Sequence, residues 1–165
     1  MQVKQITRCA LLASVAILFG WVERMLPPLS AVPGVKFGLG NIVVLMALFL
    51  KSGHPYIESF MIMLVKISVT GLLFSGMTGF LYSLCGGLLS WGTMAILKKT
   101  NKYSVWGISV AGSAMHVSGQ MLCAMLFIGS YSLLWYWAML LFFSVPSGLV
   151  IAGLSVGVLK KVINN

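Results

Sequence analysis

Long apolar runs recur along the whole chain, and they constrain its fold more than any other feature. Several are about 20 residues long, which lets one helix cross a hydrocarbon core roughly 30 Å thick. Only 8% of the 165 residues are charged, whereas a soluble domain needs far more charge to cover its surface. Because the runs are continuous rather than alternating, they predict helices and not barrel strands. We therefore expect an all-α, multi-pass integral membrane protein.

Loop signals divide these runs into six predicted transmembrane helices, which we expect to form a single domain over residues 1–165. The predicted helices cover residues 6–22, 37–50, 56–74, about 80–97, 105–128 and 133–159, with 75–79 as a turn or a soft start of the fourth. The first could pass for a signal peptide, but no small-x-small site follows it, so we expect it to be retained. The second is short and is entered through glycines, which suggests that the segment before it dips into the protein. Pro146 predicts a kink in the sixth.

Basic residues are concentrated on one side of this predicted topology. If the N-terminus is cytoplasmic, the outer side carries only Arg24 and Lys36. The cytoplasmic side then carries Lys4, Arg8, Lys51, Lys98, Lys99, Lys102, Lys160 and Lys161. The pattern predicts that both termini are cytoplasmic. The net charge of +9 is then a topology signal, and no nucleic-acid partner is expected.

Lys66 lies near the middle of the third predicted helix. A lysine at that depth costs roughly 2.5–3.5 kcal/mol even on the lenient insertion scale. Its helix is too long on the inner side for the ammonium to reach water easily, although snorkelling is the alternative. Thr70 follows one turn later on the same face. We predict that Lys66 and Thr70 face a cavity, where the lysine binds an anionic or polar ligand.

Polar residues also form a stripe on the fifth predicted helix. Ser113, His116 and Gln120 are separated by three and four residues, so they share one face. Such a stripe lines a pocket or forms a hydrogen-bond network between helices. No second histidine or carboxylate lies nearby in sequence, so no metal site is predicted.

The stretch PGVKFGLGNIV, residues 33–43, combines two glycines with a lysine at the mouth of the short second helix. Glycine lets backbone N–H groups approach a ligand, and the helix start supplies a positive dipole end. We predict that Lys36, Gly38, Gly40 and Asn41 bind substrate; an ordinary interfacial loop is the alternative.

Carboxylates are scarce, and their scarcity limits the possible chemistry. Glu23 and Glu58 are the only two, and there is no aspartate. We expect Glu58 to form a salt bridge, and Glu23 to pair with Arg24 or with lipid headgroups. The sequence has neither a GxxxxGK[ST] motif nor an aspartate-rich motif for Mg²⁺. It therefore predicts no catalytic residue, cofactor or metal, and any transport would take its energy from another subunit.

Three stretches carry a resemblance to a known family: PGVKFGLGNIV, GGLLS at residues 86–90 with Met94, and residues 109–120. Together they resemble the small membrane proteins called Gx transporters or heptaprenyl diphosphate synthase component I. That family is similar to the substrate-capture (S) components of energy-coupling-factor transporters. The resemblance implies an S-component-like bundle of six helices in the bacterial plasma membrane, with an outer loop between the first two helices over the substrate. The chain departs from the family pattern at Val117, where the family has Asn, and at Lys66, where it has Arg.

These features favour a substrate-binding membrane subunit. It would capture a small polar or anionic, vitamin-like or precursor-like molecule for import, together with a coupling transmembrane subunit and ATPases. The alternative is a non-catalytic membrane subunit in isoprenoid or quinone synthesis or in membrane electron transfer, with a prenyl- or quinone-type ligand. A purely structural anchor is the third reading.

Overall fold

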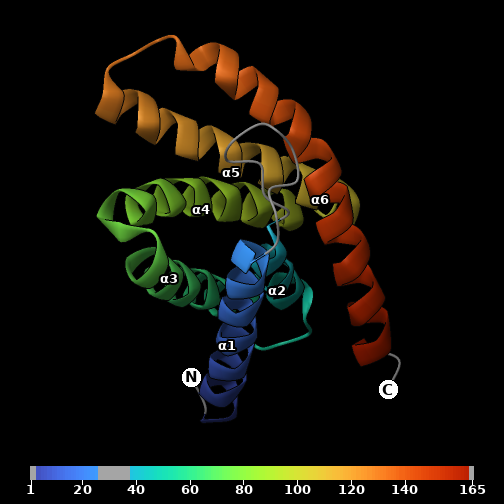
Figure 1. Cartoon of the computed structure of the whole chain (residues 1–165). Helices are drawn as coiled ribbons and strands as arrows, with labels where there is room; N and C mark the ends of the chain where they lie inside the picture. The colour runs from blue at the N-terminus through green and yellow to red at the C-terminus, as the bar shows by residue number, and fades with distance from the viewer. Residues whose placement is uncertain (1–2, 26–37, 164–165) are drawn as a thin grey trace.

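The computed structural model describes residues 3–25 and 38–163, and this part of the chain is helical. Its helices are α1 (Val3–Met25), α2 (Leu39–Phe49), α3 (Pro55–Phe74), α4 (Gly76–Lys99), α5 (Val105–Ile128) and α6 (Leu133–Ile163). All except α2 are long and apolar enough to cross a membrane. The predicted all-α membrane fold is confirmed, and the protein is a multi-pass membrane protein (Figure 1).

Helix boundaries differ from the predicted ones mainly at the ends of α1, α4 and α6. α1 extends three residues beyond the prediction at each end. α4 begins at Gly76, so the predicted turn is the first part of this helix. α6 continues beyond residue 159 because Lys160 and Lys161 are good helix formers and their charges suit a helix C-terminus. It also continues through Pro146, and Figure 1 shows α6 curving along its length.

Helix α2 lies at the centre of the core. Seven of its eleven residues are buried, although the helix is only about 16 Å long. At its N-terminus Gly38 adopts a left-handed conformation (φ 73°), which glycine accepts without strain. The Glu23 carboxylate accepts hydrogen bonds there from the backbone N–H groups of Gly38 and Leu39. At its C-terminus the Lys98 ammonium donates to the Leu48 carbonyl oxygen. A negative and a positive side chain thus satisfy opposite ends of the helix dipole.

The contacts of Glu23 and Arg24 correct the expectation that these neighbours pair with each other. Glu23 bonds to the start of α2, 15 residues along the chain. Arg24 donates to the Ser75 hydroxyl and to the carbonyl oxygen of Phe74, and its guanidinium lies 5.4 Å from the Phe74 ring centroid. Successive helical residues point in directions about 100° apart, so the two side chains reach different helices.

Glu58 forms the predicted salt bridge. The Arg8 Nη2 donates to both carboxylate oxygens, at 2.7 and 2.6 Å. The Glu58 side chain is buried, whereas that of Arg8 is 38% exposed. The pair joins α1 to α3.

Small residues bring α4 and α5 into backbone contact. A Cβ atom at Gly119 would lie 2.6 Å from the Cys85 carbonyl oxygen, and one at Gly86 would lie 2.6 Å from the His116 carbonyl oxygen. Both distances are shorter than van der Waals contact, so glycine is required at this crossing. The close approach fixes the side of α5 that carries His116 against α4.

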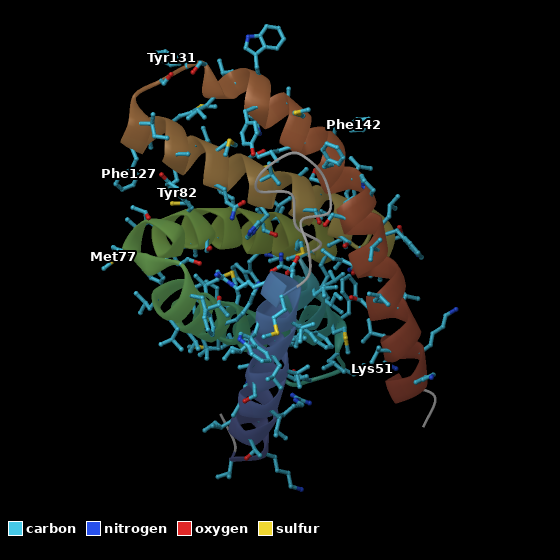
Figure 2. All side chains as sticks on the ribbon, in the orientation of Figure 1. Lys51, Met77, Tyr82, Phe127, Tyr131 and Phe142 are labelled. Carbon is cyan, nitrogen blue, oxygen red and sulfur yellow. The ribbon has the colours of Figure 1, made fainter. Side chains whose placement is uncertain are left out.

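The bundle consists of two halves. α1, α2 and α3 pack against one another, and α5 packs between α4 and α6. Contacts of α3 with α4 and of α2 with α6 join the halves. In Figure 1 the first turn of α1 and the last turn of α6 lie at the same end of the molecule. Figure 2 places Lys51 toward that end and Tyr131 toward the other.

Candidate functional site

A cavity of about 330 Å³ lies between the two halves of the bundle, and all six helices contribute to its wall. The first half of the chain provides Gly20, Glu23, Arg24, Gly38, Asn41, Lys66, Ile67 and Thr70. The second half provides Tyr82, Ser83, Ser113, His116, Val117, Gln120, Met121, Ala124, Tyr136, Leu140, Phe143, Ser144, Ser147 and Ile151. These residues come from the last turns of α1, the start of α2, the second half of α3, the first part of α4, the middle and later turns of α5, and the first two thirds of α6. The cavity therefore lies toward the end of the bundle opposite to both ends of the described chain.

Lys66 projects from α3 into this cavity and is half-buried. Its ammonium donates a 2.6 Å hydrogen bond to the Asn41 side-chain oxygen of α2. Gly40 makes room for it, because a Cβ atom there would lie 2.8 Å from the Lys66 Cε. Thr70 also lines the cavity, but its hydroxyl donates to the Lys66 carbonyl oxygen within α3. The lysine is thus held by α2 while its charge remains beside open volume.

The polar stripe on α5 faces the same cavity. Ser113, His116 and Gln120 all line it, as the three- and four-residue spacing predicted for one helix face. The contact with α4 positions them, since a Cβ atom at Gly86 would lie 2.8 Å from the Gln120 Cγ and 3.3 Å from the His116 Cε1. A larger residue at position 86 would push these two side chains into the cavity.

Of the predicted site residues, most come together in space. Those lining the cavity are Gly38, Asn41, Lys66, Thr70, Ser113, His116 and Gln120. Gly40 lies behind the lysine and shapes its position. Lys36 lies outside the described residues. The residues come from three helices, α2, α3 and α5, and are separated by up to 82 positions in sequence (Gly38 to Gln120), so this meeting is a result of the fold.

Sequence reasoning missed the tyrosine and phenylalanine rings that line the cavity, and it missed both charged residues at the end of α1. Tyr136, Phe143 and Ser147 lie on one face of α6, and their spacing of seven and four residues is the signal that could have indicated them. Tyr82 of α4 also makes an edge contact with Phe127, with ring centroids 6.2 Å apart (Figure 2). Arg24, expected on the outer side of the membrane, also borders the cavity.

Charge around the cavity is unequal. The described lining residues carry two side-chain cations, Arg24 and Lys66, and one carboxylate, Glu23, which gives a formal charge of +1 with His116 neutral. The carboxylate is directed at the N-terminus of α2. In a low-dielectric bundle this excess attracts an anionic or strongly polar ligand more strongly than it would in water. Among residues 3–25 and 38–163 no group of three or more His, Cys, Asp or Glu side chains is placed to hold a metal ion.

Comparison with known proteins identifies the family of this chain. No curated protein and no solved structure matches the chain significantly. The family model described as heptaprenyl diphosphate synthase component I matches residues 12–158, a range that includes every described residue of the cavity wall. With nearly the whole chain matched, this protein belongs to the heptaprenyl diphosphate synthase component I family.

Proposed function

We propose that this protein is a substrate-binding membrane subunit, similar in role to the S components of energy-coupling-factor transporters. It captures a small polar or anionic molecule and passes it to an ATP-driven partner module for import. The observation that carries the proposal is Lys66, an ammonium group beside a cavity inside the helical bundle whose wall includes several polar side chains. We also propose that residues 1–165 form one domain, because helices from both halves of the chain line the same cavity.

The position of Lys66 argues for a ligand rather than for stability alone. A lysine within the bundle costs several kcal/mol unless it faces a cavity or a partner. Asn41 supplies a neutral partner, and the cavity supplies space for a charged one. Its volume, about 330 Å³, is near the lower end of the range for small-molecule pockets, roughly 300–1,000 Å³. This favours a small metabolite over a long lipid chain.

The location of the cavity supports capture from outside. With the N-terminus cytoplasmic, as the basic residues predict, the half of the bundle that holds the cavity is the outer half. The sequence has no phosphate-binding loop of the GxxxxGK[ST] type, so an ATPase partner would provide the energy.

Ligand binding by the purified full chain tests this function. Small molecules carried through purification would be identified by mass spectrometry after denaturation, and their rebinding measured for the original protein and for Lys66→Met. We expect a small polar or anionic ligand whose affinity falls about 10- to 150-fold in Lys66→Met, the equivalent of one charge-assisted hydrogen bond of roughly 1.5–3 kcal/mol. Lys51→Met is the matched control, since Lys51 is exposed at the other end of the molecule (Figure 2).

Two results would contradict the proposal. One is a ligand bound equally well by Lys66→Met, which would put the site elsewhere. The other is failure of any coupling subunit or ATPase to co-purify from gently solubilised native membranes, which would count against the transport step alone.

A second function is favoured by the family description, which names a component of a prenyl diphosphate synthase. In this reading the protein is a non-catalytic membrane subunit of isoprenoid or quinone synthesis, or of membrane electron transfer, and its cationic cavity accepts the headgroup of a prenyl- or quinone-type ligand. Co-purification of such a lipid together with a soluble synthase subunit, and without an ATPase, would favour this function over import.

A further inference from the structure

The cavity is chemically divided along the boundary between the two halves of the bundle. Among the described lining residues, every side chain with a formal charge belongs to α1–α3, and these are Glu23, Arg24 and Lys66. Every ring belongs to α4–α6, and these are Tyr82, His116, Tyr136 and Phe143. One wall is therefore electrostatic and the facing wall is aromatic.

The aromatic wall is also rich in hydrogen-bonding groups. Gln120 offers an amide, which both donates and accepts, and His116 offers a ring nitrogen of each kind in its neutral form. Serine hydroxyls stand beside the rings on α5 and α6, at Ser113, Ser144 and Ser147. A purely hydrocarbon group has no polar atom that could bond to these groups. A flat heterocycle would stack on the rings and bond to the polar groups at its edge.

The cationic wall limits the ligand's charge. Among the described lining residues, two cations and one carboxylate leave an excess of one positive charge, which one anionic group balances. Arg24 donates to acceptors on α3 and at Ser75, and Lys66 donates to the Asn41 oxygen, so both cations are held at the wall where they would meet a ligand anion. A dianion would reverse the charge of a site within the membrane, which is costly.

We infer that the ligand is a compact planar heterocycle carrying a single acidic group, with the acid beside Lys66 and Arg24 and the ring against Tyr136, Phe143 and His116. This inference rests on the proposed function and narrows it to a ligand class. The two requirements, charge and ring, depend on different helices and can be tested independently.

Equilibrium dialysis of the full chain in detergent micelles, with protein-free micelles as the blank, tests both requirements. The probes are three matched pairs of a ring acid and its neutral analogue, and one acid without a ring. The pairs are nicotinate and nicotinamide, indole-3-acetate and indole-3-acetamide, and pterin-6-carboxylate and 6-hydroxymethylpterin. The ring-free acid is hexanoate.

We expect at least one ring acid to bind at least tenfold more tightly than both its neutral analogue and hexanoate. In Lys66→Met the affinity for that acid should fall to the affinity for its neutral analogue. In Tyr136→Leu the affinities for the acid and for its analogue should both fall by a similar factor. Lys51→Met should bind as the original protein does. Comparing each acid with its neutral analogue on the original protein decides whether the ligand's charge is required, even where a variant is unstable. Phe143→Leu provides a second test of the aromatic wall.

The failures are distinguishable. Hexanoate that binds as tightly as every ring acid, and is lost in Lys66→Met, overturns the ring requirement and leaves the anion-binding subunit in place. Neutral analogues that bind as tightly as their acids overturn the charge requirement. No binding by any probe overturns the inferred ligand class, while the ligand recovered by mass spectrometry separately decides the proposed function.

Discussion

Removing either partner of the Arg8–Glu58 pair should destabilise the protein to very different extents. In Arg8→Met the Glu58 carboxylate, whose side chain is 1% exposed, remains buried without its cation. Such an uncompensated buried charge costs about 3–5 kcal/mol. In Glu58→Gln the charge left behind is that of Arg8, whose side chain is 38% exposed and keeps part of its hydration. The loss should then be about 1–2 kcal/mol, near that of one hydrogen bond to a charged group.

The double variant Arg8→Met/Glu58→Gln separates this asymmetry from ordinary packing effects. It leaves no buried charge, so it should be more stable than Arg8→Met alone. The coupling free energy in the double-mutant cycle should be at least about 1 kcal/mol. Arg8→Lys should cost less than Arg8→Met, because both bonds to Glu58 come from one guanidinium nitrogen, and a single ammonium can replace that point charge.

Reversible unfolding by sodium dodecyl sulfate in mixed micelles, followed by the fluorescence of the five tryptophans, measures these free energies. The control is Lys4→Met, an exposed cation in the same first turns of α1. Equal losses for Arg8→Met and Glu58→Gln, or additive losses in the double variant, would refute the reasoning, because either result would mean that burial of the unpaired carboxylate does not dominate.

Two further predictions concern packing around the core. Gly119→Ala should lower the free energy of unfolding by about 1–3 kcal/mol in the same assay, because the new methyl group meets the α4 backbone, which has little freedom to move. The matched control is Gly157→Ala, because a Cβ atom at Gly157 would have no neighbouring atom within 4 Å. A similar loss in both variants would contradict the close contact. Lys98→Met should lower the free energy of unfolding by about 1–2 kcal/mol, because it removes the hydrogen bond to the last turn of α2, whereas Lys99→Met, at an exposed position, should lower it little. We expect faster hydrogen exchange at the end of α2 in Lys98→Met alone. Equal exchange in both variants would show that Lys98 does not hold this helix.

Much of the fold could be predicted because the membrane leaves few choices. An apolar run of sufficient length must form a helix, since backbone groups have no water to bond with. The helix-breaking loops therefore set the six elements, and the prediction errors are confined to helix ends, where the last turn depends on individual residues. The shortness of α2 was also visible, because the glycines and the Lys51–Pro55 loop limit it on both sides.

The candidate site was predicted only in part, for a physical reason. A charged or polar residue in an apolar helix stands out against its neighbours, and this identified Lys66 and the α5 stripe. An aromatic residue in the same helix does not stand out, because lipid contact and cavity contact are equally favourable for it. Whether Tyr136 and Phe143 face the cavity depends on how α6 is rotated about its axis, which its packing against α5 and α2 determines. Glu23 was misassigned because its partner lies across a loop rather than within its own helix.

Helix α2 links the stability of the bundle to the chemistry of the cavity. Glu23 and Lys98 hold its two ends, and between them it presents Asn41 to Lys66 and Gly40 to the lysine stem. Asn41 accepts from one of the three N–H groups of the Lys66 ammonium, so a ligand anion can bind the ammonium without displacing Asn41. The gain from a ligand anion is then one charge-assisted hydrogen bond, a few kcal/mol at most. Tight binding would then require additional contacts from α4–α6, which is why selectivity among anions should depend on this part of the cavity wall, whose described residues carry no formal charge.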